Sequence, residues 1–138
     1  MAVGLFIDPV FYKIGSGSFL NSFFSTIYVK LENNNWGSKY PLIMNDLYNG
    51  CVNKNNIDEF KEEISRLRLE LKQLHPDQIV WNFEDLSEIP PWGSEVSSEI
   101  TSMENYFVTS EGYNLIDVIE KSIVASEEIE EDICIKSI

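Results

Sequence analysis

The sequence contains few of the residues on which metal binding and most catalysis depend. Its 138 residues include one histidine, His75, and two cysteines, Cys51 and Cys134. A closed zinc site needs four nitrogen or sulfur ligands, so a structural zinc is not expected. Two cysteines far apart in the sequence do not make a disulfide framework. Reduced thiols in a cytoplasm are the simplest interpretation, with a single disulfide left open. We expect neither a metal nor a cofactor.

Long apolar runs are also missing. No stretch approaches the ~18 residues that a membrane-spanning helix requires. The opening segment MAVGLFIDPV has no basic residue before its apolar run, and Asp8-Pro9 ends that run early, unlike a secretory signal peptide. With 43% apolar and 24% charged residues, the composition is that of a globular protein. We therefore expect one domain, residues 1–138, located in the cytoplasm.

Basic residues are scarce and unevenly placed. The chain has 10 Lys and Arg against 23 Asp and Glu, for a net charge of −13, and no basic residue occurs between Lys72 and Lys121. The acidic residues in this interval are Asp77, Glu84, Asp85, Glu88, Glu95, Glu99, Glu104, Glu111, Asp117 and Glu120. Such a field repels nucleic-acid phosphates and anionic membranes and attracts basic proteins. Solubility alone is the alternative explanation.

Apolar periodicity predicts a mixture of strands and helices. Alternating apolar residues indicate strands at 2–8, 11–14 and 132–138, and a short apolar run indicates a buried strand at 78–83. Apolar spacings of three and four, with helix-start and helix-stop residues, predict helices. The expected helices cover 19–31, 41–48, 57–74 and a segment that begins at Gly112 or Asn114. The predicted fold class is α+β, with a small, mostly antiparallel sheet and about four helices packed mainly on one face.

The segment Gly15–Ser18 precedes an apolar helix and could in principle hold a phosphate. A Walker loop, however, needs a lysine where Phe19 stands, and the dinucleotide fingerprint needs a glycine at position 20, which is Leu. Ser16 or Ser18 as a helix N-cap explains the same residues without a ligand. We expect the capping role, and a phosphate-binding or small-ligand module stays open as an alternative.

The remaining chemistry-bearing residues do not suggest a catalytic set. His75 stands at the predicted end of a helix, where it can satisfy terminal carbonyl groups, and nothing in the spacing brings it close to Cys51 or Cys134. The run EEIEED, Glu127–Asp132, lacks the glycine and the alternating oxygen ligands of a calcium loop. A carboxylate pair from residues 84–104 could serve a hydrolase and also stays open. We expect a protein that is not an enzyme.

The stretch EDLSEIPPWGSEVSSEI, residues 84–100, is the best candidate for a contact surface. It follows a predicted buried strand, it combines acids with Trp92, and Pro90 and Pro91 stiffen it. The alternative is that Trp92 packs onto the core and that the acids only keep the loop hydrated. The expected partner-binding residues are Asp77, Glu84, Asp85, Glu88, Trp92, Glu95, Glu99 and Glu104, with Trp36 as a second aromatic anchor.

Four stretches of the sequence together resemble the immunity protein 70 family of bacterial polymorphic toxin systems. They are GSGSFLNSFFSTI, WGSKYPLIMNDLYNG, EDLSEIPPWG and EITSMENYFVTSEG, in this order. The resemblance runs from about Val3 to the last predicted helix. It implies an α+β protein, encoded beside a toxin gene, that protects the producing cell by binding the toxin. It carries over no toxin-contacting residues.

Composition and resemblance agree on one function. A small acidic protein without a catalytic set is suited to neutralise a basic enzyme, and nucleases have basic clefts because they bind phosphates. We expect a stoichiometric inhibitor of a cognate toxin domain, with acids that steer the encounter and Trp92 that anchors it. Nucleic acid and membrane are not expected as partners. A homodimer through exposed aromatic residues stays open.

Overall fold

Alternating apolar residues at the N-terminus form the first hairpin of the sheet. In the computed structural model, which describes residues 2–93 and 96–137, β1 (Ala2–Ile7) pairs antiparallel with β2 (Val10–Ser16). Leu5 and Ile7 of β1 and Ile14 of β2 are buried, as period-two alternation requires. Both predicted strands are confirmed.

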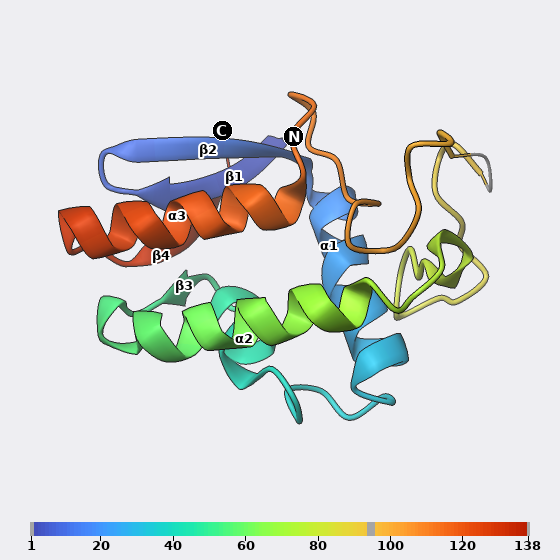
Figure 1. Cartoon of the computed structure of the whole chain (residues 1–138), viewed down its shortest axis with the longest axis horizontal. Coiled ribbons are helices and arrows are strands. Elements are labelled where there is room, and N and C mark those ends of the chain that lie inside the picture. Colours follow the sequence, from blue (N-terminus) through green and yellow to red (C-terminus); the bar gives the residue numbers. More distant parts are fainter. Residues whose placement is uncertain (1, 94–95, 138) are drawn as a thin grey trace.

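The C-terminal strand lies next to the first strand. β4 (Ile133–Ser137) pairs antiparallel with β1, and β3 (Cys51–Val52) pairs antiparallel with β4, which gives the order β2-β1-β4-β3. The sheet therefore joins both ends of the chain in its centre, because Val3 pairs with Ser137 (Figure 1). The predicted terminal strand is confirmed within the described residues, and Ile138 lies outside them.

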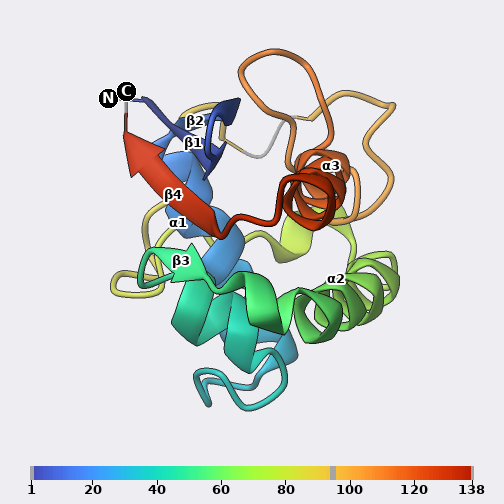
Figure 2. The same ribbon diagram turned by 90° about the vertical axis from the view of Figure 1, so that its left-hand side faces the viewer.

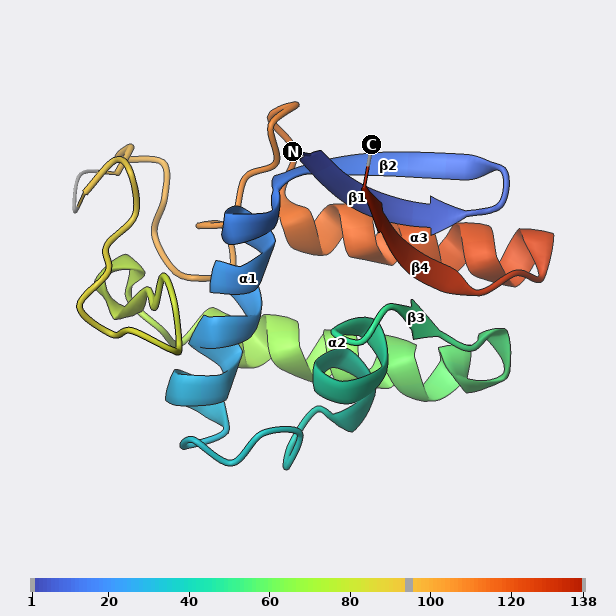
Figure 3. The same cartoon turned by 180° about the vertical axis from the view of Figure 1, so that it is seen from behind.

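Helices cover one face of this sheet. The helical elements are α1 (Gly17–Thr26), η1 (Ile27–Leu31), η2 (Leu42–Leu47), η3 (Lys54–Asn56), α2 (Ile57–Leu71), η4 (Pro76–Gln78) and α3 (Leu115–Ile129). α3 packs on β1, β2 and β4, and α2 packs beside α3, where Figure 2 shows both helices end-on. In Figure 3 the strands lie in front of α3, and no described ribbon covers their outer face. The α+β prediction is confirmed.

The predicted buried strand at 78–83 is wrong. Residues 76–78 form the short 3-10 helix η4, and the segment that follows is irregular and does not belong to the sheet. Within residues 78–83, Val80 is the only apolar residue that is buried, with 7% of its surface exposed. The segment packs against α1 instead of a strand, because hydroxyl groups of α1 satisfy its backbone.

A buried carboxylate holds the start of η2. Glu63 of α2 is 4% exposed, and its Oε1 accepts hydrogen bonds from the backbone N–H groups of Leu42 and Ile43, each at 3.1 Å. Burial raises the pKa of Glu63 above its usual value, and the two N–H donors oppose this only in part. The carboxylate therefore serves as a cap whose charge is costly to bury.

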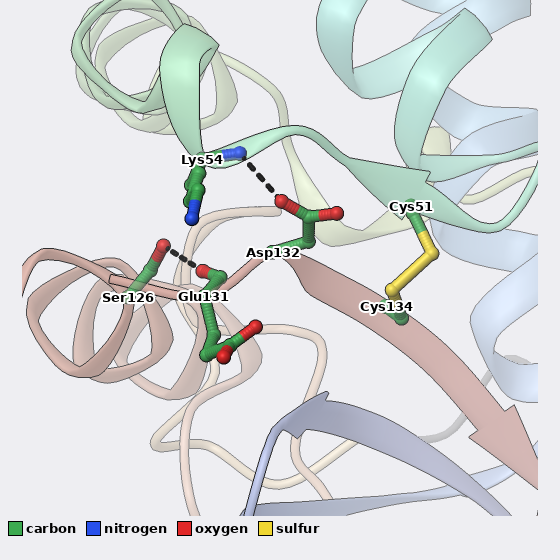
Figure 4. Close-up of a disulfide and its surroundings, with 6 residues drawn as sticks. All are labelled: Cys51, Lys54, Ser126, Glu131, Asp132 and Cys134. Carbon is green, nitrogen blue, oxygen red and sulfur yellow. Dashed lines mark hydrogen bonds between the residues drawn. A yellow bond between two sulfur atoms is a disulfide. The ribbon is translucent and has the colours of Figure 1, made fainter. Parts of the chain in front are cut away.

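Cys51 and Cys134 form a disulfide, so the expectation of reduced thiols is wrong for this structure (Figure 4). The two residues are direct cross-strand partners of β3 and β4, with their Cα atoms 4.1 Å apart. Beside the bond, the backbone N–H of Lys54 donates to Oδ1 of Asp132 at 2.9 Å. The pairing was hidden in the sequence, because 83 positions separate the two cysteines and only the sheet brings them together.

Removing the disulfide should lower the free energy of unfolding. For a closed loop of this length, the chain-entropy relation gives about 4.5 kcal/mol. Wild-type protein should lose this stability in dithiothreitol, as measured by urea unfolding, and should then match the variant Cys51→Ser/Cys134→Ser. The double variant should not respond to the reductant. A wild-type midpoint that is the same with and without reductant would show that the bond does not form in solution.

Replacing Glu63 by Gln should change how stability depends on pH. Because the pKa of Glu63 is raised in the folded state, the stability linked to its proton is complete below the usual value of 4.5 and is lost as pH rises through the folded-state pKa. Glu63→Gln cannot lose this proton, and its amide oxygen can still accept both N–H groups. The free energy of unfolding of the variant minus that of the wild type should therefore increase as pH rises from 4.5 to neutral.

Urea unfolding across this pH range measures the difference. Glu59→Gln is the matched control, because Glu59 lies exposed on the same helix, and its difference from wild type should not grow in the same way. A Glu63→Gln difference that stays constant or shrinks as pH rises would contradict the role of burial at this carboxylate.

Candidate functional site

Three hydroxyl groups on one side of α1 hold the segment that leads into the acidic region. The Oγ of Ser22 donates to the carbonyl oxygen of Val80 at 2.8 Å, and the N–H of Val80 donates to Oγ1 of Thr26 at 3.1 Å. Three residues further on, the N–H of Phe83 donates to Oγ of Ser25 at 3.0 Å. Ser22 and Thr26 are fully buried, so these bonds are shielded from water. We call this set the α1 hydroxyl anchor.

The chain beyond the anchor projects past α1, away from the sheet (Figure 1). We call residues 82–104 the acidic loop; residues 94–95 lie outside the described part of the chain. Short-range bonds order this loop. Oδ1 of Asp85 accepts from the N–H of Ser87 at 3.1 Å, and Oδ1 of Asn105 accepts from the N–H of Thr101 at 3.1 Å. The Nδ2 of Asn105 also donates to the carbonyl of Glu99 at 2.9 Å.

Most acids expected at the contact surface are free of basic partners. Asp77, Glu84, Asp85, Glu88 and Glu99 are exposed, and within residues 2–93 and 96–137 none of them pairs with a lysine or arginine. The Ser87 hydroxyl and backbone N–H lower the pKa of Asp85, which keeps it charged at neutral pH. Asp77 has only His75 beside its carboxylate, and the other four have no basic partner among the described residues.

Two of the expected acids are placed differently. Glu104 is bound to Arg68 of α2 at 3.2 Å, and its side chain is only 14% exposed. The same guanidinium also binds Asp117 at 2.9 Å and Glu120 at 2.5 Å, which joins α2 to α3 and to the end of the acidic loop. Glu104 is thus a neutralised side chain of the fold. Glu95 lies outside the described residues.

The two aromatic residues expected as anchors have unlike surroundings. Trp92 is 44% exposed, its Nε1 donates to Oη of Tyr106 at 2.9 Å, and its ring meets that of Trp81 edge-on at 5.4 Å. It is therefore held in place while part of its ring faces solvent. Trp36 donates to the carbonyl of Met44 at 2.8 Å and packs on Phe83, the first aromatic residue of the acidic loop. Trp36 therefore contacts the start of the acidic loop through Phe83.

A hollow opens between the two halves of the loop region. It lies between residues 75–90 and 96–106, has a volume of about 700 Å³, and is called the loop groove below. Its apolar lining comprises Ile79, Leu86, Ile89, Val96, Ile100 and Tyr106. Sequence reasoning overlooked these residues, although Leu86 and Ile89 stand out as apolar positions between acids in EDLSEIPPW. Burial raises the pKa of Tyr106, opposed by the Trp92 bond, so the phenol is neutral at neutral pH.

Comparison with known proteins decides the family. The family model of immunity protein 70 matches residues 5–135 of the chain. The chain belongs to the immunity protein 70 family. No curated protein and no solved structure matches it. The match confirms the resemblance inferred from the four sequence stretches, and it identifies an immunity protein, whose partner is a protein toxin.

The other candidates weighed from the sequence have plain structural roles in this immunity protein 70 family member. The Oγ of Ser16 accepts from the N–H of Phe19 at 3.1 Å, so the capping interpretation of Gly15–Ser18 is confirmed. His75 does not satisfy helix-end carbonyls as expected. Its Nδ1 instead accepts a hydrogen bond from the N–H of Asp77 at 3.3 Å, so His75 is the N-cap of the following helix η4.

No helix of residues 2–93 and 96–137 is both long and apolar enough to cross a membrane. In the same part of the chain, no three side chains of His, Cys, Asp or Glu gather as a metal-ion site would require.

Thr26→Val should weaken the α1 hydroxyl anchor with little change of shape. The buried N–H of Val80 would lose its acceptor, so the free energy of unfolding should fall by about 1–3 kcal/mol. Urea unfolding measures the loss, and amide exchange should show reduced protection of Val80. Thr101→Val is the matched control at an exposed position and should change stability by less than about 0.5 kcal/mol. Equal effects of the two substitutions would contradict the anchor.

Proposed function

We propose that this immunity protein neutralises a basic, nuclease-type toxin domain by forming a stoichiometric complex with it. Family membership supplies the toxin partner. The observation that carries the rest is the group of exposed acids at Asp77, Glu84, Asp85, Glu88 and Glu99, which no lysine or arginine of the described chain neutralises. Nuclease clefts are basic because they bind phosphates, so such a group would fit them.

We propose the acidic loop as the docking region because it combines free acids with exposed apolar side chains at the loop groove. Arg68 binds Glu104, Asp117 and Glu120, so its single positive charge is shared among three carboxylates, and Lys61 lies 3.8 Å from Glu127. Charges without a counter-ion on a projecting loop produce a field in the solvent that attracts an oppositely charged partner. The expected consequence is a fast association that slows as salt screens the charges.

In this role the protein acts as an inhibitor and not as an enzyme. Its acidic field makes nucleic acid and anionic membranes poor partners. We place the interaction in the cytoplasm of the producing cell. Disulfides are rare there, so binding should not require the Cys51–Cys134 bond. This bond joins β3 and β4, whereas the acidic loop projects beyond α1 at the other end of the molecule (Figure 1).

Reversing the loop charges should slow association with the toxin. The test variant is Glu84→Lys/Asp85→Lys/Glu88→Lys, and the partner is the purified toxin domain encoded beside the gene. At low salt, the association rate constant should fall by a factor of about 10 or more, and its salt dependence should flatten. Stopped-flow mixing measures the rate, and co-expression with the toxin scores cell survival.

The control carries the same change of net charge at the opposite end of the molecule. Glu128→Lys/Glu130→Lys/Glu131→Lys alters the exposed end of α3, which Figure 1 shows far from the acidic loop. Its association rate should fall much less. Equal slowing by both variants would assign the effect to net charge, and unchanged rates in both would remove electrostatic docking from the proposal. Absence of any complex with wild-type protein would overturn the neutralising function.

A further inference from the structure

We infer that the loop groove receives an apolar side chain that projects from the toxin with a lysine or arginine next to it. This inference rests on the proposed function, since it names the chemistry by which the acidic loop holds its partner. Three features of the groove carry it: its size, its exposed apolar rim and the sign of its charge.

The groove has room for a protruding side chain. Its volume of about 700 Å³ lies within the range of sites that bind small molecules or anchor residues. A smaller hollow of about 270 Å³ adjoins it and shares Val96, Ile100 and Tyr106. The Trp92–Tyr106 hydrogen bond lies where the two hollows meet and fixes both rings. The wall at Tyr106 is thus held in place, which lowers the entropy that this ring loses on binding.

The rim exposes apolar residues that contribute little to the fold. Leu86 is 66% exposed and Ile89 is 69% exposed, although both line the groove. Apolar side chains gathered at the mouth of a hollow mark an interaction site more often than isolated ones do. An apolar or aromatic side chain of the partner would remove both from water, as residues at binding hot spots do.

The negative charge of the groove favours a basic residue next to the apolar side chain of the partner. Asp77 and Glu88 are among the lining residues, and the lining contains no lysine or arginine. His75 also lines the groove; its Nδ1 accepts a hydrogen bond from the N–H of Asp77 at 3.3 Å and lies 3.1 Å from Oδ1 of the same residue. An acidic partner residue would therefore lie beside carboxylates without a counter-charge, at a cost in free energy. A basic residue beside the apolar one meets two carboxylates.

Polar substitutions at the rim test the apolar part of the inference. Leu86→Ser and Ile89→Ser should each raise the dissociation rate of the complex with the purified toxin domain by at least about fivefold. Their association rates and salt dependence should match those of the wild type, because no charge changes. Leu69→Ser is the matched control, since Leu69 is 63% exposed on α2 outside the groove. Urea midpoints of all three variants confirm that they fold.

Charge-neutralising substitutions test the basic part. Asp77→Asn/Glu88→Gln should weaken binding about fivefold or more at low salt and less at high salt. If wild-type protein binds the toxin while Leu86→Ser and Ile89→Ser dissociate no faster than Leu69→Ser, the groove inference is overturned and immunity stands. If Asp77→Asn/Glu88→Gln binds as the wild type does, the basic neighbour is overturned. If wild-type protein forms no complex, the proposed function fails together with the inference.

Discussion

The hydrogen bonds between α1 and Val80 are the interaction on which the candidate site depends. A buried peptide unit must find a donor and an acceptor inside the protein, and here the hydroxyls of Ser22 and Thr26 provide both. Ser25 adds a third bond, to Phe83, directly before the acidic loop begins. The loop therefore leaves the core at a fixed point and in a fixed direction. Without these hydroxyls the segment would need a strand partner, and the sheet offers none at this position.

Acidic residues divide into two groups with opposite roles. Glu32 and Glu63 are buried; Glu32 accepts backbone N–H groups of the segment between η1 and η2, and Glu63 accepts those at the start of η2, so both carboxylates organise the chain. Arg68 likewise binds three carboxylates, one at the end of the acidic loop and two on α3. On the acidic loop, Glu84, Asp85, Glu88 and Glu99 are exposed without a lysine or arginine partner in the described part of the chain, and exposed apolar side chains lie beside them at the loop groove. A surface that only maintained solubility would not need this combination.

The regular elements were predictable because their signals are local. The spacing of apolar residues in α2 and the alternation in β1 identify helix and strand without knowledge of their neighbours, and both are confirmed. The run at 78–83 has the same composition as a buried strand, yet its backbone partners are hydroxyls on α1. Composition cannot distinguish these two ways of satisfying a buried backbone. The loop groove was also overlooked, because its lining comes from two segments that meet only in the fold.

The sequence by itself determined the α+β class, the family and the acidic character of residues 77–120, since all three follow from residue types and their order along the chain. Tertiary structure alone decided which acids stay free, where Trp36 and Trp92 point their polar atoms, and that Cys51 meets Cys134 across 83 positions. The physical reason is the range of the interactions. Periodicity acts within a few residues, whereas ion pairs, disulfides and buried hydrogen bonds act between groups that only folding brings within a few ångströms.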